Sequence, residues 1–525
     1  MSSHELFVLI LISVLIVMLP ALGLYKMFPK AGIPAWKAWV PFLNTWEIIK
    51  VARISKHWFF WQFIPVAGWF ISMWLLIEFV KLFGKFRLID HAAVVFIPFL
   101  YFPYIGFNEK ERYLGPEQVK KHKKSVAREW IDAAVFAIVA ATLIRIFVFE
   151  AYTIPTGSME KTLLVNDFLF VSKLSYGPRI PNTPLAVPFV HHTVPFFNSK
   201  SYTETLSLPY TRWFSSPVKR NDVVVFNFPA GDTLTKEYDS QVPYYDILRT
   251  EESRMYAQLQ GQVKDPVQLS ALAAQRSRDA VWDQYTVVTR PVDKRENYIK
   301  RCVAIAGDTL SIRDGLLYIN NEKAFVSPTS STDHLVYTTN KVLTEDELRE
   351  AGVMLNSDES SPDFMYNVAN NYRINLTESE VAIVKNIPGV DSVVRNISTS
   401  FGEVFPYHPQ YNWSIDNFGP LWVPKKGVTI PLTPENIILY KRLIFVYENN
   451  SWEERDGKIY INGEATTNYT FKMNYYWMMG DNRHRSQDSR YWGFVPEDHI
   501  VGEAWLIWMS YDSGLRWNRL FRTIH

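Results

Sequence analysis

The stretch Phe147-Val-Phe-Glu-Ala-Tyr-Thr-Ile-Pro-Thr-Gly-Ser-Met-Glu160 leads from the end of an apolar segment into a short polar loop. Pro155 ends the helical pattern, because proline lacks an N–H group and disfavours α geometry in the residue before it. Gly157 then gives the backbone freedom directly before Ser158. The serine follows a segment of membrane length, so we expect it at a membrane surface. Taken alone, the loop favours a simpler interpretation, a polar hinge between an anchor and a soluble domain.

Apolar runs are concentrated in the first 150 residues, at 6–24, 58–77, 91–107 and 130–149. The first run has no charge and is long enough to cross a bilayer. It does not resemble a cleavable signal peptide, because no lysine or arginine precedes it and no small-x-small site follows it cleanly. Pro98 and Pro103 interrupt the third run, which makes it the weakest candidate. Buried helices of a soluble protein would hardly produce four such runs in so short a stretch.

The fourth run has Asp132 and Arg145 near its two ends, where such side chains can reach the polar interface. It stands directly before the polar loop and would attach the rest of the chain to the membrane. We therefore predict an N-terminal membrane region at 1–128, with about three spans and a basic cytoplasmic loop. Residues 129–150 are the predicted transmembrane anchor of the domain formed by the rest of the chain.

Lysine and arginine in the short loops predict the orientation of these spans. No basic residue precedes the first run, whereas the loops after the first and before the fourth contain Lys26, Lys30, Lys37, Lys120, Lys121, Lys123, Lys124 and Arg128. Both loops are expected in the cytoplasm, which places everything after residue 150 outside. The loop between the second and third runs, which this topology places outside, contains Lys81, Lys85 and Arg87. That hairpin is either re-entrant or a local exception to the rule.

Residues 151–525 are predicted to form an exported, β-rich domain. Alternating runs bounded by turn residues predict core strands at 168–172, 222–228 and 298–305. Two regions interrupt this rhythm. Near 235–290 the helical spacing at 269–282 predicts a helical insertion. Residues 325–445 are rich in Asn, Ser, Thr and Pro and have no clean period, which predicts an inserted cap or subdomain.

Two segments resemble each other, Arg313-Asp-Gly-Leu-Leu-Tyr-Ile-Asn-Asn-Glu322 and Arg455-Asp-Gly-Lys-Ile-Tyr-Ile-Asn-Gly-Glu464. Each predicts a strand, an Asp-Gly hairpin turn, an alternating strand and a further turn. Two copies are too few for a repeat architecture, so we interpret them as similar hairpins.

The composition argues against nucleic-acid binding and against a disulfide framework. The formal net charge of +2 argues against general nucleic-acid binding, for which a strongly basic domain is expected. The single cysteine, Cys302, excludes an internal disulfide framework. Its place inside an alternating run favours a packed strand residue over a catalytic thiol.

Three segments contain reactive groups. The first contains Ser158 and the second contains Lys300. Lys300 lies between apolar residues in a predicted strand. Burial there would lower its pKa by disfavouring the ammonium form, and a neutral lysine can act as a general base. The alternative is a surface lysine on the polar face of an edge strand, with Arg301 on the other face, and the strand alone favours that alternative.

The third segment is Gly480-Asp-Asn-Arg-His-Arg-Ser-Gln-Asp-Ser-Arg-Tyr-Trp-Gly-Phe-Val-Pro496, which is too polar for a core strand. Ser486, Asp488 and Arg490 alternate, so an extended loop would point all three to one side. A hydroxyl, a carboxylate and a guanidinium on one side suit a hydrogen-bonded support for a nearby site. A solvated turn is the simpler alternative.

Taken together, these segments resemble a bacterial type I signal peptidase. The similar boxes are Ile154-Pro-Thr-Gly-Ser-Met159 for the nucleophile, Asn221-Asp-Val-Val-Val-Phe226 for a structural strand, Tyr298-Ile-Lys-Arg301 with Gly307-Asp308 for the lysine, and the segment from Gly480 to Pro496. They stand in the family's order, with an apolar segment directly before the serine. The resemblance covers the fourth apolar run and the β core. It covers neither the first three runs nor most of 325–445.

Four positions depart from the family's pattern. Lys161 stands where the family usually has proline, and Thr156 replaces a common serine but keeps the hydroxyl. Asn166 and Asn221 occupy places that are usually glycine before aspartate. Asparagine is the next best residue for left-handed backbone, so these two turns are expected to survive.

The resemblance implies a membrane-anchored, mainly β catalytic domain of the signal peptidase type with an inserted α/β cap, and a Ser-Lys dyad. Ser158 Oγ would attack the scissile carbonyl, and neutral Lys300 would take its proton and later deliver it to the leaving amine. The Ser158 backbone N–H and the Thr156 hydroxyl would form the oxyanion hole.

The resemblance also assigns roles to the final segment. Ser486 would hydrogen-bond and orient the lysine, while Asp488 and Arg490 would hold the loop by a salt bridge. No metal or cofactor is expected, because the chemistry needs none and no metal-ligand spacing stands out in the sequence.

The family's substrates are exported preproteins, cut after a small-x-small sequence at the end of the signal peptide. Together with the four apolar runs and the basic loops, the resemblance implies a multi-pass protein of the bacterial inner membrane with its catalytic domain on the extracytoplasmic side. Preproteins and the lipid bilayer are the expected partners, the secretion machinery is a further candidate, and no nucleic acid is expected.

Three other classes are weighed against this one. A non-catalytic membrane scaffold gives no reason for Ser158, Lys300 and Ser486 to occur together. A self-cleaving Ser-Lys regulator normally has a DNA-binding domain in place of membrane spans. An intramembrane peptidase needs reactive groups inside its spans, and Asp132 alone does not supply them.

Overall fold

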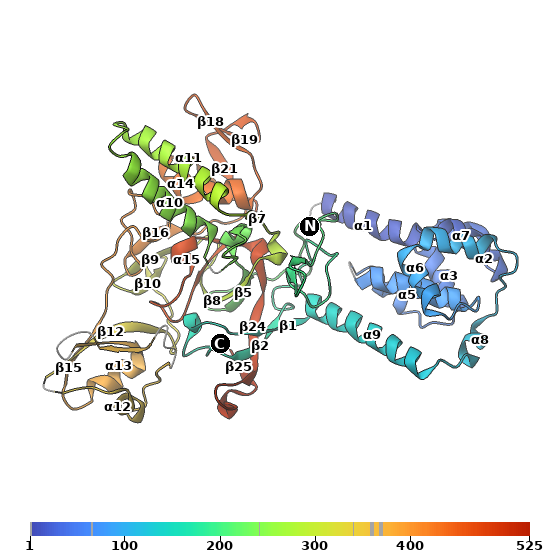
Figure 1. The fold of residues 1–525 in the computed structure, drawn as a ribbon, viewed down its shortest axis with the longest axis horizontal. Coiled ribbons are helices and arrows are strands. Elements are labelled where there is room, and N and C mark those ends of the chain that lie inside the picture. Colours follow the sequence, from blue (N-terminus) through green and yellow to red (C-terminus); the bar gives the residue numbers. More distant parts are fainter. Residues whose placement is uncertain are drawn as a thin grey trace. The chain divides into compact units, whose positions relative to one another are not determined.

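The computed structural model describes residues 3–64, 67–240, 242–339, 341–356, 362–366 and 371–524 (Figure 1). The chain forms two units. The first comprises Met1–Val148 and Pro178–Trp213, and the second comprises Phe149–Gly177 and Phe214–His525. Each unit has its own apolar core.

The first unit is mainly helical. Its helices are α1 (Ser3–Met18), α2 (Ala21–Lys30), α3 (Leu43–Val51), α4 (Trp58–Trp61), α5 (Ala67–Lys81), α6 (Leu88–Phe96), α7 (Pro98–Phe107), α8 (Pro116–Lys121) and α9 (Val126–Phe147), and its short strands are β3 (Thr193–Val194) and β4 (Ser199–Lys200). Phe28, Phe79 and Phe102 are fully buried in its core. Helices α2 and α7 cross closely at Gly23, where an added Cβ would lie 2.1 Å from the backbone of Phe102.

Among the described residues, only α9 is by itself long and apolar enough to cross a membrane. The pair α6 and α7 meets the same test together, but it is bent by 120° at its break. The first predicted span, 6–24, is divided where α1 ends and α2 begins, because Pro20 stands at the break. The second, 58–77, forms α4 and most of α5, and two of its residues lie outside the described ones. The prediction of continuous spans within 1–128 therefore differs from the described helices, whereas 130–149 lies almost wholly in α9.

The second unit is built on an antiparallel sheet with the strand order β1-β2-β24-β5-β8-β22-β23, in which β25 also pairs with β24. These strands are β1 (Phe149–Thr153), β2 (Asp167–Ser172), β24 (Ile500–Ser510), β5 (Val223–Asn227), β8 (Asn297–Ala304), β22 (Tyr475–Met479), β23 (Val495–Pro496) and β25 (Arg522–Thr523). The three core strands predicted from the sequence correspond to β2, β5 and β8, which lie in this one sheet.

A second sheet has the order β11-β10-β9-β16 and extends the same core. Its strands are β9 (Thr309–Arg313), β10 (Leu316–Ile319), β11 (Glu322–Lys323) and β16 (Phe418–Trp422). Trp477, Phe418 and Phe494 pack in contact at the centre of the unit and are almost fully buried. The sequence signals near 313 and 455 do form Asp-Gly hairpins, since Asp314 and Asp456 have φ of 50° and 52°.

The smaller elements of the unit form hairpins and helices around this core. They are β6 (Thr233–Thr235), β7 (Val287–Thr289), β17 (Thr429–Pro431), β18 (Trp452–Arg455), β19 (Lys458–Ile461), β20 (Glu464–Ala465), β21 (Asn468–Thr470), α14 (Pro434–Arg442) and α15 (Ser489–Trp492). The predicted helical insertion is a pair of helices, α10 (Tyr244–Leu259) and α11 (Pro266–Gln284).

The region predicted as one inserted cap, 325–445, is divided in the structure. Residues 331–395 form a subdomain with the strand order β13-β14-β12-β15 and a core of its own, which includes Val336, Ile374 and Val384. Its elements are β12 (Ser331–Thr338), α12 (Glu345–Glu350), β13 (Phe364–Tyr366), β14 (Asn371–Thr377), α13 (Glu378–Lys385) and β15 (Val390–Arg395). The rest, including β16 and α14, packs into the main core and is not a separate cap. In Figure 1 the subdomain and the α10–α11 pair lie at opposite ends of the unit.

Candidate active site

The loop of Ser158 connects β1 and β2 over residues 154–166 and turns back on itself. Its two ends are joined by backbone bonds of 2.9 Å from Ile154 to Asp167 and from Asn166 to Ile154. Asn166 has a φ of 64°, as its place in a left-handed turn predicts. Met159 is fully buried beside Ser158, whose own side chain stays partly accessible. Burial of Met159 therefore holds the backbone of the turn next to the serine.

Lys300 reaches Ser158 from strand β8 of the same sheet. Its Nζ lies 2.7 Å from Ser158 Oγ and 2.9 Å from the carbonyl oxygen of Ile299. The lysine comes from the central strand β8 and is 3% exposed, so the alternative of a surface lysine on an edge strand is wrong. The two residues that the sequence placed in separate segments form one hydrogen-bonded pair.

Burial lowers the pKa of Lys300 to about 8. The negative charges of Asp488 and Asp481 act in the opposite direction but do not cancel the desolvation. No carboxylate in the described part of the chain forms an ion pair with the amine. A neutral amine within hydrogen-bond distance of a hydroxyl can accept its proton, which is the geometry of an activated nucleophile.

The predicted hydrogen bond between Ser486 and Lys300 is not made in the structure. Ser486 Oγ is buried and has no hydrogen-bond partner among the described residues. It lies against Gly480, where an added Cβ would be 2.2 Å from this oxygen and 2.5 Å from the carbonyl oxygen of Ser158. Lys300 instead donates to the Ile299 carbonyl, which explains why it makes no hydrogen bond to Ser486. Ser486 still lies close to the turn that contains Ser158.

Asp488 and Arg490 form a buried ion pair of 2.8 Å in which both side chains are almost fully enclosed. Burial alone would raise the pKa of Asp488, but the guanidinium of Arg490 outweighs it and the pKa is lowered. Asp488 also accepts a 3.1 Å hydrogen bond from the backbone N–H of Gly480. The predicted extended alternation is wrong, because Asp488 caps the short helix α15 and Arg490 lies in its first turn.

A second buried pair was missed by the sequence reasoning. Arg301 and Asp481 lie 2.7 Å apart with side chains 1% and 0% exposed. Asp481 also accepts a 2.7 Å hydrogen bond from the hydroxyl of Thr162 in the serine loop. Both partners belong to segments singled out in the sequence, and the available signal was an arginine in strand β8 and an opposite charge just after the apolar strand β22.

Asn482 ties the final segment to the serine turn. Its backbone N–H donates to the Ser158 carbonyl at 3.2 Å, and its side-chain amide donates to the Gly157 carbonyl at 3.1 Å. The amide of Asn375, from the inserted subdomain, donates to Asn482 Oδ1 at 3.0 Å. The turn is therefore held from behind by two regions far apart in the sequence.

Lys161 departs from the family's proline for a reason visible in the backbone. Its φ is 68°, which a proline ring cannot adopt. The side chain is buried, and its ammonium group lies 2.5 Å from Glu380 and 2.9 Å from the carbonyl oxygen of Asn375. Both partners belong to the inserted subdomain.

Thr156 is exposed and has an extended backbone just before the serine. In the part of the chain that the structure describes, neither its hydroxyl nor the backbone N–H of Ser158 donates a hydrogen bond. The Thr156 hydroxyl and the Ser158 backbone N–H are thus available to donate hydrogen bonds to an oxygen atom of a bound molecule. Among these same residues, no group of three or more His, Cys, Asp or Glu side chains could hold a metal ion.

Cys302 is fully buried in β8, and burial raises the pKa of its thiol. A thiol held in its protonated form is a poor nucleophile, so the interpretation as a packed strand residue is confirmed.

Comparison with known proteins gives two family matches. The sequence model described as "Signal peptidase, peptidase S26" matches residues 127–359 and 445–509. These ranges contain all six residues predicted from the sequence, Thr156, Ser158, Lys300, Ser486, Asp488 and Arg490. A family of unknown function, DUF5684, matches residues 36–116.

Several relatives have the name "Signal peptidase I", and three of them show how identity and coverage vary. The protein of Buchnera aphidicola from Acyrthosiphon pisum is 25% identical over 413 residues, which is 77% of this chain and 84% of the relative. That of Haemophilus influenzae is 23% identical over 418 residues, covering 78% of this chain and 79% of the relative. That of Rickettsia canadensis is 36% identical over 106 residues, covering 20% and 33%.

Proposed function

The chain belongs to the signal peptidase family S26 and is a serine endopeptidase, and we propose that it removes signal peptides from exported preproteins with a Ser158–Lys300 dyad. The observation that supports the dyad most directly is the 2.7 Å contact between Ser158 Oγ and a lysine amine that is buried without a counter-ion among the described residues.

In the proposed reaction, the lone pair of the neutral Lys300 amine accepts the Ser158 proton as Oγ attacks the scissile carbonyl carbon. The resulting ammonium group then gives this proton to the leaving amine, and an acyl-enzyme remains on Ser158. A water molecule, deprotonated by the same amine, hydrolyses the ester and frees the serine. One group serves as base and acid because its pKa of about 8 is close to the working pH.

The negative charge on the carbonyl oxygen needs hydrogen-bond donors. The Ser158 backbone N–H and the Thr156 hydroxyl are the proposed pair, since both lie at the mouth of the turn and neither donates to a described group. Removing one such donor typically costs about 10²–10³ in kcat. Thr156→Val therefore tests this part of the proposal separately from the dyad.

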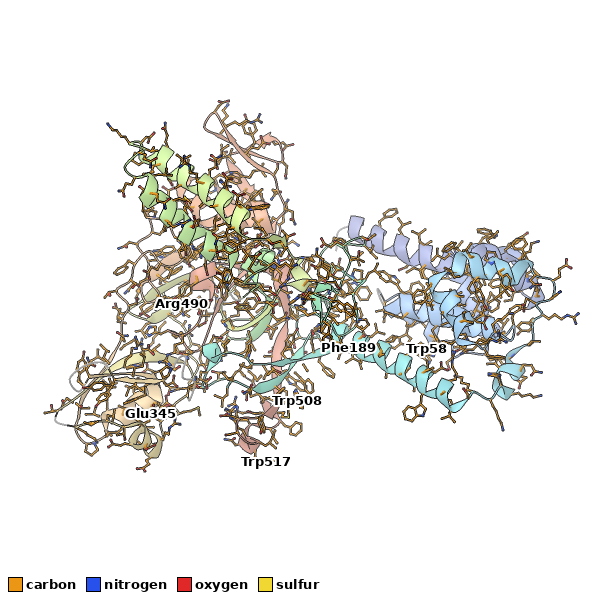
Figure 2. The ribbon with its side chains drawn as sticks, viewed as in Figure 1. Trp58, Phe189, Glu345, Arg490, Trp508 and Trp517 are labelled. Atoms are coloured by element: carbon orange, nitrogen blue, oxygen red, sulfur yellow. The ribbon has the colours of Figure 1, made fainter. Side chains whose placement is uncertain are left out.

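The bilayer is the proposed place of action. The apolar face of α9 is uncovered, with Trp130 and Phe136 more than 70% exposed. In the second unit, Trp517 is 75% and Phe521 73% exposed near the C-terminal end of the chain (Figure 2). Such aromatics are suited to a membrane interface. We place the protein in the bacterial inner membrane with the second unit on the extracytoplasmic side, where signal peptides emerge and cleavage follows a small-x-small sequence.

The test is incubation of the full chain in detergent or vesicles with a preprotein that has an Ala-x-Ala site, followed by N-terminal sequencing of the product. Cleavage directly after the second alanine is expected. Ser158→Ala should remove the activity while the protein still inserts and folds, because only a small, partly accessible side chain is changed. Cleavage that persists in Ser158→Ala, with no other peptidase present, would contradict the serine mechanism.

A further inference from the structure

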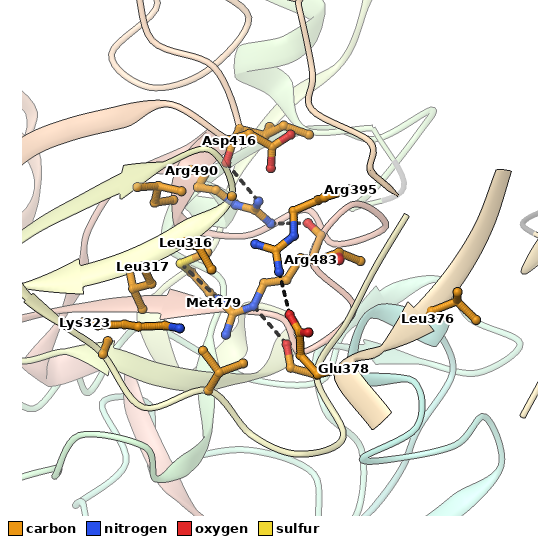
Figure 3. Close-up of a pocket in the computed structure, with 17 residues that line it drawn as sticks. Leu316, Leu317, Lys323, Leu376, Glu378, Arg395, Asp416, Met479, Arg483 and Arg490 are labelled. Carbon is orange, nitrogen blue, oxygen red and sulfur yellow. Dashed lines mark hydrogen bonds and ion pairs between the residues drawn. The ribbon is translucent and has the colours of Figure 1, made fainter. Parts of the chain in front are cut away.

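A cavity of about 460 Å³ lies behind the 480–490 loop (Figure 3). Its walls come from the β9–β10 hairpin, the inserted subdomain and the loop itself. Six charged residues line it, namely Lys323, Glu378, Arg395, Asp416, Arg483 and Arg490. The dyad residues are absent from the lining, so this cavity is separate from the candidate active site.

Arg483 is the unusual member of this set. Its side chain is buried, and its described partners are Ser330 Oγ at 3.2 Å and Met479 Sδ at 3.4 Å. No carboxylate in the described residues forms an ion pair with it. Burial lowers the pKa of the guanidinium to about 10, although the charges of Asp481 and Asp488 act in the opposite direction. A buried charge without an opposite charge is costly, which makes the absent partner informative.

Three other buried arginines of this unit show what is missing. Arg301 is paired with Asp481, Arg490 with Asp488, and Arg519 with Asp167. Each guanidinium faces a carboxylate of the protein. Arg483 instead faces the cavity.

The remaining charges of the lining do not neutralise Arg483. Glu378 is paired with Arg395 at 2.6 Å, and Asp416 lies 2.9 Å from His484. Lys323 has no ion pair among the described residues, and its amine points across the cavity toward the Arg483 guanidinium (Figure 3). Two cations thus converge on one space, while both acidic residues have other partners.

We propose that this cavity binds a phosphate group between Arg483 and Lys323. A planar guanidinium can give two parallel hydrogen bonds to such an oxyanion, and a lysine ammonium adds a point charge from the opposite side. The bound group would supply the counter-ion that none of the described residues supplies. Because Arg483 directly follows Asn482, the same ligand would steady the loop that holds the Ser158 turn.

The experiment is calorimetric titration of the full chain in detergent at low ionic strength, with two ligands in separate runs. Inorganic phosphate represents a free ion, and glycerophosphoglycerol represents the phosphodiester of a lipid headgroup. The compared variants are Lys323→Glu and, as a matched control on the similar hairpin, Lys458→Glu. Loss of a charge-assisted hydrogen bond should weaken binding at least about tenfold in the first variant and leave the second unchanged.

Saturable binding of either ligand with this pattern supports the site and identifies the source of the phosphate group. Absence of saturable binding by both ligands would overturn the proposal. Equal affinities of Lys323→Glu and the wild type would overturn it as well, since binding would then occur elsewhere. The proposed peptidase activity does not enter these outcomes.

A different observation carries a second inference, which rests on the proposed function. The buried Lys161–Glu380 pair joins the loop of Ser158 directly to helix α13 of the inserted subdomain. Glu380 is already held by the backbone N–H groups of Thr377 at 2.8 Å and Met354 at 2.9 Å, so its position is fixed by the subdomain. We infer that Lys161 is a positioning residue, through which the subdomain sets the distance between Ser158 and Lys300.

The test compares preprotein cleavage by Lys161→Met, Lys161→Arg and the control Lys385→Met, which changes an exposed lysine of the same helix. Misplacement of the serine should lower kcat about tenfold or more in Lys161→Met with little change in KM. Lys161→Arg should recover part of the loss, because it can pair with Glu380, and Lys385→Met should match the wild type.

An unchanged kcat in folded Lys161→Met would overturn this inference. Absence of cleavage by the wild type would overturn the proposed function instead. In that case a double-mutant cycle on stability, with Lys161→Met and Glu380→Gln, still tests the link, and independent effects of the two changes would contradict it.

Discussion

Lys300 and the two aspartates of the 480–490 loop, Asp481 and Asp488, are buried to a similar degree, but they differ in their surroundings. Lys300 faces a hydroxyl and a carbonyl oxygen, and burial lowers its pKa to about 8. Asp481 and Asp488 each face a guanidinium, which keeps their pKa values low despite burial. The unpaired Lys300 amine can give up its proton near neutral pH, whereas the two paired carboxylates stay ionised. Lys300 is therefore reactive because it has no described counter-ion, and the two aspartates form a rigid support because each has one.

The largest expected effect comes from replacing the unpaired base. Arginine keeps a positive charge but does not deprotonate in proteins. Lys300→Arg should therefore be as inactive as Lys300→Ala, with kcat/KM lower by at least about 10²–10⁴. Cleavage of a preprotein with an Ala-x-Ala site is the measurement, and Lys219→Arg, on an exposed lysine, is the control. Substantial activity of Lys300→Arg would show that an electrostatic role suffices.

Removing one residue of a buried ion pair should mainly lower the stability of the fold. Asp488→Asn leaves Arg490 buried without its carboxylate, and a broken buried pair typically costs about 3–5 kcal/mol. The free energy of unfolding of the second unit, measured by denaturant titration, should fall by this order. Asp279→Asn, on the exposed face of α11, should change it little. Equal stabilities of the two variants would contradict the role assigned to the pair.

The unpaired lysine should itself reduce stability at neutral pH. Its pKa is about 8 in the folded protein and about 10.4 in an unfolded chain, so below pH 8 both states are protonated and the folded state bears the full cost of burial. Lys300→Met should then raise the free energy of unfolding by roughly 3 kcal/mol or less. The wild type releases its proton first in the folded state as pH rises from 8, so the advantage of methionine should shrink toward pH 10.4. An advantage that stays constant over this range would contradict the lowered pKa.

The smallest effect on stability is expected at Ser486. Its buried hydroxyl has no described partner, so Ser486→Ala removes an unsatisfied group and should change the free energy of unfolding by about 1 kcal/mol or less. A loss of several kcal/mol in thermal or denaturant unfolding would show that the hydroxyl is bonded in solution. Such a loss would also support the hydrogen bond between Ser486 and Lys300 that the family resemblance implies.

Local signals in the sequence were sufficient for the parts of the site that depend on short stretches. The Ser158 turn, the strand of Lys300 and the Asp-Gly hairpins at 314 and 456 follow from proline, glycine and alternating patterns over a few residues. The boxes could be assigned because they resemble a known family. None of these features requires knowledge of distant contacts.

Distant contacts account for the features that were missed. The Arg301–Asp481 pair joins positions 180 residues apart, and the Lys161–Glu380 pair joins positions 219 apart. The inserted subdomain has no clean period because its short strands alternate with turns and two small helices. The apolar run at 6–24 is continuous in composition, but it is divided between α1 and α2 because Pro20 lies at the break.

The pH dependence of kcat/KM for preprotein cleavage tests the central claim most directly, because it reports the ionisation of the free enzyme's base. If neutral Lys300 is the base, the rate should rise with pH through an apparent pKa near 8 and then level off. The limb should be absent from the residual activity of Lys300→Arg. A rate that is already maximal at pH 6, or a limb that remains unchanged without the lysine, would show that another group takes the proton of Ser158.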